Sequence, residues 1–257
     1  MKLRTVLLST MLLLLSASLM AQNANEISSK AMDNINVGNM EITATIYIRD
    51  GKGNDRVREI AIASKQFGNV YKRIIRFTAP ADVKGTAVLV HDYEDRADDM
   101  WIYMPALRNV RRIVSNEKGK NFMGSEFTNA DMSKPNDADF TNKIVGSARV
   151  NGRECWKVES EGKTNAIKAE NGFSKRVAYI DKENYLCYKI DYFDMRGNLH
   201  REQWIREYRK QPDGKYFAFK MSMKNVKNGR VSDMHIKQFK ASSSLSESAF
   251  APSALGN

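Results

Sequence analysis

Few residues of this 257-residue chain have the types and spacing that catalysis requires. The three histidines, His91, His200 and His235, do not stand at metal-ligand spacing from one another or from a cysteine. No Gly-x-Ser-x-Gly elbow, phosphate-binding loop or dinucleotide fingerprint is present. We therefore expect no catalytic residue, no bound metal and no cofactor, and the sequence favours binding over catalysis.

Two acidic pairs and one cysteine are the remaining candidates for chemistry. The pairs Asp98-Asp99 and Asp137/Asp139 could hold a cation or exchange a proton, but acidic pairs in turns are more often solvated surface. Cys155 could act as a nucleophile only beside a base, and a strand cysteine next to a tryptophan is usually an inert core residue. A small envelope hydrolase is therefore the weakest functional hypothesis.

Residues 98–132 place large apolar side chains beside arginines, a proline and a flexible Gly-Ser pair. Pro105 should end a short strand here, because proline lacks the N–H that a sheet ladder needs. Two interpretations remain open: the apolar side chains line or gate a hydrophobic cavity, or they fill the core. Together with one residue of a preceding strand, the candidate cavity residues are Phe77, Trp101, Tyr103, Met104, Leu107, Phe122, Met123 and Phe127.

Two further features of this segment lead to hypotheses. The glycine and serine of Phe122-Met123-Gly124-Ser125 predict a mobile lid over the cavity, whereas a static packed loop is the alternative. Arg111 and Arg112 should point to opposite faces of a strand, so that one faces solvent and the other faces the interior or the rim. A buried arginine would need a carboxylate, a carbonyl or a lipid headgroup.

The N-terminal residues of the chain indicate export. Lys2 and Arg4 precede an apolar stretch that ends near Leu15, and Ala21 offers a cleavage point, so residues 1–21 should form a cleaved signal peptide before one domain at 22–257. The stretch is shorter than the about 20 residues that span a membrane. The residue directly after Ala21 is not a cysteine, so no lipid anchor is expected.

The net charge is +11, from 41 Lys and Arg against 30 Asp and Glu. This excess favours attraction to anionic surfaces such as lipid headgroups, or it is simply a solvated basic surface. Nucleic acid is not an expected partner, because no basic-aromatic recognition motif is present.

Cys155 and Cys187 could form a disulfide in an exported protein. In a meander, the strand at 177–180 would separate them by two strand spacings, roughly 9–10 Å. A disulfide needs Cα atoms within about 7 Å. We therefore predict free cysteines, although another strand order would bring the two together.

Hydrophobic periodicity predicts a short amphipathic helix at 25–37, with Ile27, Ala31, Met32 and Ile35 on its apolar face, and then strands throughout. Asn151-Gly152 is a strong hairpin signal. Eleven or more strands should curl rather than lie flat. We predict a mainly β fold with short helices: a strongly curved antiparallel sheet forming an incomplete barrel, its hollow covered by helices and a loop lid. The predicted strands are 40–49, 57–64, 70–78, 86–92, 100–104, 109–114, 144–150, 153–160, 174–181, 185–193, 198–208, 216–226 and 230–239.

The segments FTAPADVKG (77–85), WIYMP (101–105), VRRI (110–113) and FMGSEF (122–127) resemble the outer-membrane lipoprotein-sorting family, the relatives of the periplasmic carrier LolA. The resemblance implies a half-open barrel lidded by helices and a monomeric periplasmic carrier without a cofactor. It also implies lipoprotein acyl chains or a related amphiphile as cargo. A functional arginine of the family corresponds to either Arg73 or Arg76.

The resemblance further implies an inner-membrane transporter of the resistance-nodulation-division type and an outer-membrane acceptor as partners. A lipid or stress sensor, or an accessory binding protein of such a transporter, is the alternative function. Transfer of cargo to acceptor membranes would distinguish a carrier from a sensor, because a sensor binds cargo without delivering it.

Overall fold

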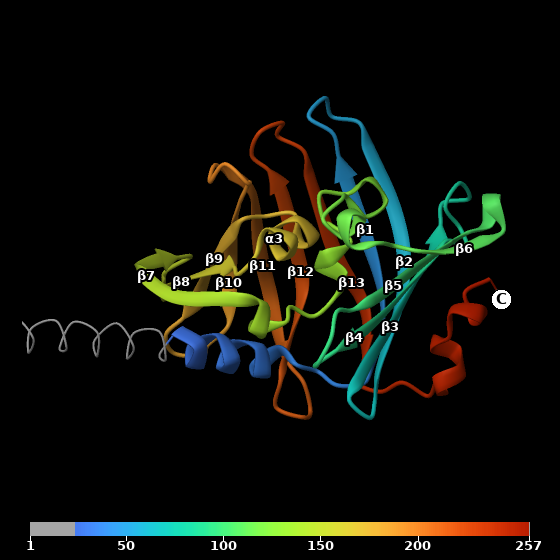
Figure 1. The fold of residues 1–257 in the computed structure, drawn as a ribbon, viewed down its shortest axis with the longest axis horizontal. Coiled ribbons are helices and arrows are strands. Elements are labelled where there is room, and N and C mark those ends of the chain that lie inside the picture. Colours follow the sequence, from blue (N-terminus) through green and yellow to red (C-terminus); the bar gives the residue numbers. More distant parts are fainter. Residues whose placement is uncertain (1–23, 257) are drawn as a thin grey trace, which may run out of the picture.

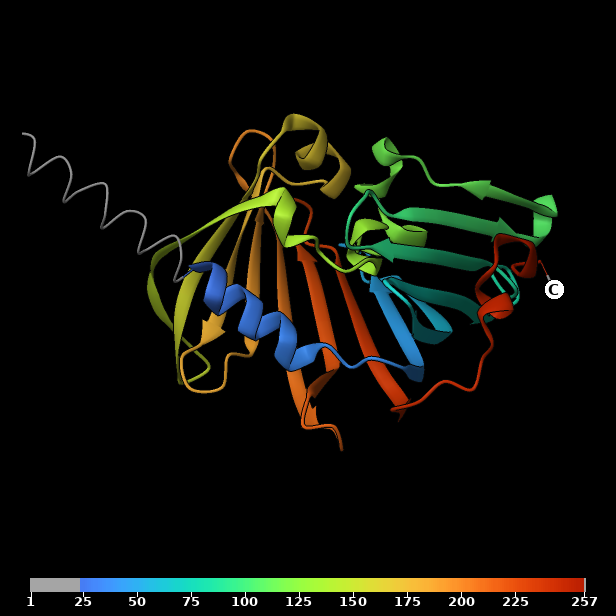
Figure 2. The same cartoon turned by 60° about the horizontal axis from the view of Figure 1, so that its bottom comes forward.

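The computed structural model of the protein describes residues 24–256, so the predicted signal peptide lies outside the described residues. Within this range thirteen strands form one antiparallel sheet that curves strongly and is not closed (Figures 1 and 2). The predicted mainly β fold is confirmed. The strands are β1 (Met40–Arg49), β2 (Asp55–Phe67), β3 (Val70–Ala79), β4 (Ala87–Tyr93), β5 (Asp99–Met104), β6 (Asn109–Arg112), β7 (Phe140–Val150), β8 (Arg153–Gly162), β9 (Lys175–Asp181), β10 (Cys187–Phe193), β11 (Leu199–Lys210), β12 (Tyr216–Asn225) and β13 (Val231–Lys240).

The chain builds this sheet outward from its middle. Strand β1 pairs with β2 on one side and with the last strand, β13, on the other. From β1 a meander runs to the edge strand β6, and after a crossing it resumes at the opposite edge, β7, and returns to β13. The two edges are therefore joined through residues 113–139, which we call the crossing segment.

Local sequence explains most of these strands. On β1 the alternating apolar residues are buried, among them Ile42, Ile46 and Ile48, as period-two patterning predicts. Thr45 on the other face is also buried. Asn151 and Gly152 both have positive φ, 50° and 82°, which is the backbone of a tight hairpin between β7 and β8.

A helix at residues 24–35 lies across the concave side of the sheet and packs against β8 and β9 (Figure 2). Ala24, Ile27 and Ala31 are buried and form a small core with Val158 and Ile180. This confirms the predicted amphipathic helix. The predicted apolar face included Ile35, but this residue at the last turn is 39% exposed.

The crossing segment covers the middle of the concave face (Figure 2). It contains the short helix α2 (Ser115–Lys118) and the 3-10 turns η2 (Phe122–Gly124), η3 (Ala130–Met132) and η4 (Asp137–Asp139). Phe122 and Phe127 are buried against the inner faces of the strands. The segment therefore supplies core side chains as well as covering the hollow.

Helix α3 (Asn165–Asn171), between β8 and β9, was not predicted from the sequence. The Thr164 hydroxyl caps it by accepting from the Ile167 N–H at 3.2 Å, and Gly172 ends it with a φ of 74°. A Cβ on Gly119 would lie 2.8 Å from the Gly172 Cα. These two glycines therefore allow α2 and α3 to approach closely.

The C-terminal tail (residues 241–256) covers the outer, convex face of β3–β5 (Figure 1). It contains the 3-10 turns η5 (Glu247–Phe250) and η6 (Pro252–Ala254), with Pro105–Leu107 (η1) at the adjoining β5–β6 turn. Phe250 and Leu255 are fully buried against Ala87 and Leu89. Strand β4 is consequently buried on both faces.

Polar contacts hold the tail in place. Arg76 donates to the carbonyls of Ala254 and Leu255 at 2.9 and 3.1 Å. The His91 ring nitrogen Nε2 lies 2.8 Å from the Phe250 carbonyl oxygen, and Lys72 pairs with Glu247 at 2.6 Å. The tail is therefore an integral layer of the fold.

Replacing Phe250 with Ala is expected to lower the free energy of unfolding by about 3–5 kcal/mol, because it empties a fully buried aromatic site. Urea denaturation measures this. Leu107→Ala, at a side chain that is 63% exposed, is the control and should change the value by less than about 0.5 kcal/mol. Equal small effects would show that the tail does not contribute to the folded core.

Candidate ligand cavity

A cavity of about 880 Å³ lies on the concave side of the sheet, beneath the N-terminal helix and part of the crossing segment. Its walls are predominantly apolar and come from both halves of the sheet. Wall residues on β1–β3 and β10–β13 include Ile42, Ile62, Ile75, Ile190, Ile205, Met221, Met234 and Ile236. Two strand systems far apart in sequence therefore create one apolar hollow, of the size that small-molecule sites have.

The roof of the cavity comes from three separate pieces. The helix at 24–35 contributes Ala31 and Met32, α3 contributes Ile167, and residues 130–139 contribute η3 and η4. Polar contacts tie the roof to the walls, among them the ion pair of Asp131 with Arg201 on β11 at 2.9 Å. Arg73 on β3 donates to the Met132 carbonyl, and the backbone N–H of Lys134 donates to Asp92 at 3.1 Å.

Several polar groups within the walls are uncharged and hydrogen-bonded within the protein. The Tyr192 hydroxyl donates to Gln203 at 2.8 Å, and the Tyr208 hydroxyl donates to the Cys187 carbonyl at 2.6 Å. Burial raises the pKa of both phenols, so both stay protonated. Apart from Arg73 and Arg176, the strands therefore present mainly hydrocarbon and neutral polar groups to the cavity.

Charged side chains border the cavity. The acidic ones outnumber the basic ones, and Asp33, Asp137 and Asp139 stand in or near the roof. Burial raises the pKa of Asp137 and of Asp139. The bordering charged residues are Asp33, Arg73, Glu94, Asp95, Arg96, Asp98, Lys118, Asp131, Lys134, Asp137, Asp139, Glu170 and Arg176.

Strand alternation separates the two arginines proposed for the family's functional position. Arg73 and Ile75 face the cavity, whereas Arg76 points to the convex face and binds the C-terminal tail. Besides Met132, Arg73 also donates from Nε to the Ser64 hydroxyl at 3.2 Å. Arg73 is therefore the arginine of this pair that links the cavity wall to the roof.

Of the eight apolar residues named from the sequence, Phe127 lines the cavity. Phe77 and Phe122 are fully buried with ring centroids 5.7 Å apart, in the core beside it. Met104 and Met123 pack against that same core. These four side chains fill space between the sheet and the crossing segment.

The other three lie further away. Trp101 and Tyr103 pack on the convex side with Phe250 and Leu255, because alternation on β5 turns Met100 and Ile102 inward instead. Leu107 is exposed. The structure therefore places seven of the eight off the cavity wall, and their role in ligand binding stays a prediction.

Arg111 and Arg112 are both exposed on the edge strand β6, so neither is buried in the interior, and a position of one of them at the rim stays a prediction. Arg111 pairs with Glu117 at 2.7 Å, and Arg112 pairs with Asp99. An edge strand at this position has no covering layer over either arginine, which explains why both remain in solvent.

The candidate chemical groups lie on different elements of the fold. Among residues 24–256, no group of three or more His, Cys, Asp or Glu is arranged to hold a metal ion. Cys155 and Cys187 are free thiols on β8 and β10, with β9 between them, as predicted. Burial raises the pKa of Cys155 and raises that of Cys187 to about 12, so both thiols remain protonated and poorly nucleophilic.

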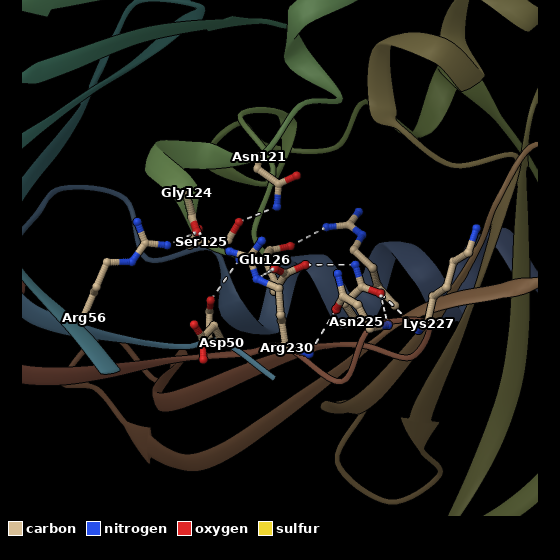
Figure 3. A network of polar contacts seen from close by, with 12 residues as sticks. Asp50, Arg56, Asn121, Gly124, Ser125, Glu126, Asn225, Lys227 and Arg230 are labelled. Atoms are coloured by element: carbon tan, nitrogen blue, oxygen red, sulfur yellow. Dashed lines mark hydrogen bonds and ion pairs between the residues drawn. The ribbon is translucent and has the colours of Figure 1, made fainter. Parts of the chain in front are cut away.

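A buried polar network fixes the crossing segment beside the cavity (Figure 3). Glu126 is 2% exposed; its carboxylate pairs with Arg230 at 2.9 Å and accepts from Asn225 at 3.0 Å. Arg201, also 2% exposed, donates to the Glu126 carbonyl at 3.1 Å and pairs with Asp131 at 2.9 Å. Residues at the ends of β11, β12 and β13 thereby hold this segment in place through hydrogen bonds and ion pairs.

The same network bears on the two interpretations of residues 122–125, which are a mobile lid and a static packed loop. Arg230 donates to the Gly124 carbonyl at 3.1 Å, and the Phe122 N–H donates to the Phe127 carbonyl at 2.7 Å. Phe122 and Ser125 are fully buried. These contacts favour the packed alternative for residues 122–125, because opening would expose buried charges and an aromatic ring. Whether the segment moves as a lid stays a prediction.

Glu126→Gln is expected to lower the free energy of unfolding by about 3 kcal/mol, because it leaves Arg230 and its neighbours without their buried carboxylate. This is the lower end of the usual range, since the Arg230 side chain is 33% exposed. The control is Glu26→Gln, which removes an exposed pair with Lys30 and should cost less than about 0.5 kcal/mol. Similar values in urea denaturation would contradict the anchoring role.

The buried carboxyl group of Asp98 should make the stability of the protein depend on pH. Burial, followed by the nearby charge of Asp92, raises the pKa of Asp98 to about 7. A free aspartate titrates at about 3.9. Between these values the folded protein holds a proton that the unfolded chain has lost, so this group lowers stability as pH rises from about 4 to about 7.

Asp98→Asn should therefore raise the melting temperature relative to the parent protein at pH 8, and the difference should shrink towards pH 4. The amide oxygen can still accept the Tyr93 N–H that Asp98 accepts at 3.1 Å. Thermal unfolding followed by circular dichroism measures both. A difference that is the same at the two pH values would mean that the charge of Asp98 is not responsible.

The fold is that of the LolA superfamily. A "putative outer membrane lipoprotein-sorting protein domain" from Vibrio parahaemolyticus is similar with a TM-score of 0.85 and 26% identity, over 92% of this chain and 100% of that one. A LolA superfamily protein from Nitrosomonas europaea has a TM-score of 0.71 and 19% identity, over 89% and 97% of the two chains. The resemblance to the lipoprotein-sorting family is thus confirmed.

A DUF1329 family protein from Desulfovibrio piger is similar with a TM-score of 0.84 and 27% identity, over 92% of this chain and 99% of that one. A family model described as "Uncharacterized protein" matches residues 70–257, and the chain belongs to that family. No curated protein matches the sequence. In residues 24–256, no helix is long and apolar enough to cross a membrane.

Proposed function

We propose that residues 22–257 form a single carrier domain that binds the acyl chains of lipoproteins, or a related amphiphile, in the 880 Å³ cavity. The apolar hollow on the concave side of the sheet is the observation that carries this proposal. The similarity to the lipoprotein-sorting domain supports it. Phe127, Ile75, Ile205 and Met221 would contact the bound chain, and Arg73 would stand near its end at the roof.

Simple energetics explain why such cargo needs a carrier. Burying one methylene contributes about 0.8 kcal/mol, so a sixteen-carbon chain gains on the order of 12 kcal/mol on leaving water. An acyl chain therefore does not cross an aqueous compartment unescorted. Methionine side chains such as Met32, Met221 and Met234 in the walls adapt to flexible chains of different shape.

The roof suggests where cargo enters. Residues 130–139 are joined to β3 and β4 through Arg73 and Asp92, and Lys134 Nζ donates to Asn36 at 3.0 Å. By contrast, residues 122–132 are anchored by the buried ion pairs of Glu126 with Arg230 and of Asp131 with Arg201. Entry would move residues 133–139 and the adjoining helix, while these two anchors stay in place.

Location and partners belong to the same proposal. A carrier of this kind would be exported by the signal peptide at residues 1–21 and would act in the periplasm. It would receive cargo from an inner-membrane transporter and deliver it to an outer-membrane acceptor. The family resemblance implies a transporter of the resistance-nodulation-division type. Binding rather than catalysis is the proposed activity, and the protonated state of Cys155 and Cys187 supports this choice.

A direct test measures uptake of a fluorescent sixteen-carbon acyl probe by the delipidated protein. The parent protein should bind it, and Ile205→Glu should weaken binding by at least about tenfold, because the new carboxylate lies in an apolar wall. Val145→Glu, at an exposed position on edge strand β7, is the matched control and should bind like the parent.

Melting temperatures of the two variants establish that both remain folded. No uptake by the parent protein, together with no amphiphile extracted from the protein purified from its own envelope, would refute the carrier proposal. Equal binding by Ile205→Glu and Val145→Glu would place the ligand outside this cavity.

A further inference from the structure

Three hairpin tips lie side by side at one end of the sheet. The register pairs Arg201 with Asn225, and Arg49 with Val231, so the β10–β11, β12–β13 and β1–β2 turns occupy the same end. The Val226 N–H donates to the His200 carbonyl at 2.9 Å, which joins the first two hairpins. A Cβ on Gly51 would lie 2.8 Å from the Asn228 carbonyl oxygen, so the third hairpin adjoins the second.

These tips expose apolar side chains together with cations, and we call them the hairpin patch. Met195, Leu199 and Val226 are 54%, 38% and 39% exposed. Single exposed apolar residues are ordinary on a protein surface. Three on adjoining tips, surrounded by basic side chains, are a distinct feature. The exposed cations around them are Lys52, Arg56, Arg196, Lys224 and Lys227.

Two carboxylates at the tips, those of Asp194 and Asp50, are directed into their own turns. Asp194 accepts from the N–H groups of Arg196 and Asn198, both at 2.9 Å. Asp50 accepts from Lys52 and Asn54 at 2.8 and 2.9 Å. These two acids thereby shape the turns. Of the five cations, Arg56 reaches the Gly124 carbonyl at 3.5 Å, and the other four are exposed at the tips.

We propose that the hairpin patch docks on the surface of a membrane containing anionic phospholipids. Lysine and arginine near such a surface are attracted by its negative potential, and apolar side chains at convex tips can enter the boundary between headgroups and acyl chains. The tips project from one end of the sheet (Figure 1), a shape that suits a deformable headgroup layer. The overall charge of +11 acts in the same direction.

This proposal is independent of what the cavity binds. The patch is formed by the ends of β1, β2 and β10–β13, whereas the roof of the cavity is formed by the helix at 24–35, α3 and residues 130–139. The N-terminal helix lies toward the opposite end of the sheet (Figure 1). Docking through the patch would hold the protein at a membrane while the roof remains free.

Co-sedimentation of the purified protein with vesicles tests this. Vesicles of equal parts phosphatidylglycerol and phosphatidylcholine should bind the protein, and vesicles of phosphatidylcholine alone should bind it at least about tenfold more weakly. Binding should also weaken when salt rises from about 0.1 to about 0.5 M, because the Debye length shortens. Absence of binding to the anionic vesicles, or equal binding to both kinds, would overturn the proposal.

Paired variants locate the surface. Arg196→Glu with Lys227→Glu should reduce binding to anionic vesicles by at least about tenfold, at about 1 kcal/mol for each basic residue removed from the surface. Lys210→Glu with Lys237→Glu makes the same change of net charge at exposed positions outside the patch and should reduce binding much less. Equal losses from the two pairs would show attraction by net charge alone, which contradicts a docking surface.

Met195→Asp tests the apolar part and should weaken binding by about tenfold, whereas Val114→Asp, at a side chain 51% exposed beyond edge strand β6, should leave binding unchanged. Melting temperatures near that of the parent confirm folding of each variant. An unchanged affinity in Met195→Asp would exclude insertion of the tip.

Discussion

The architecture depends on how an unclosed sheet covers its apolar concave face. Strands β6 and β7 do not meet, so the inner side chains of thirteen strands need another layer. The crossing segment between these edges supplies it, and the buried pairs Glu126–Arg230 and Asp131–Arg201 hold that segment to the sheet. Buried charges tolerate few alternative positions, because separating them leaves an unpaired charge in a dry interior. The anchor therefore fixes the edge of the hollow.

The anchor also divides the cover into a fixed part and a lightly held part. Residues 122–132 carry buried aromatic rings and the ion pairs of Glu126 and Asp131, whereas residues 133–139 are joined to β4 through the hydrogen bond from Lys134 to Asp92. A carrier requires both properties, since a hollow must persist without cargo and its roof must yield to cargo. The convex face is covered by another segment: Phe250 and Leu255 of the C-terminal tail pack on the outside of β3–β5.

Charge is distributed unevenly over this basic protein. Carboxylates outnumber cations around the cavity, while exposed lysines and arginines gather at the hairpin tips. The excess of basic residues noted in the sequence is therefore largely directed away from the ligand cavity. An acyl chain entering the hollow meets largely apolar walls, and the charges that could attract a membrane lie elsewhere on the sheet.

Local patterns in the sequence determined the strands, the N-terminal helix and the Asn151-Gly152 hairpin, because alternation, helical spacing and turn chemistry act between near neighbours. They also predicted the curled sheet and the separation of Cys155 from Cys187. Tertiary structure alone decided which apolar residues line the cavity. Trp101 and Tyr103 share a strand with inward-facing Met100, and a tail about 150 residues later covers them. Phe122 and Glu126 are buried because Arg230 and Arg201 reach this segment from distant strands, and such long-range partners leave no local signal in a single sequence.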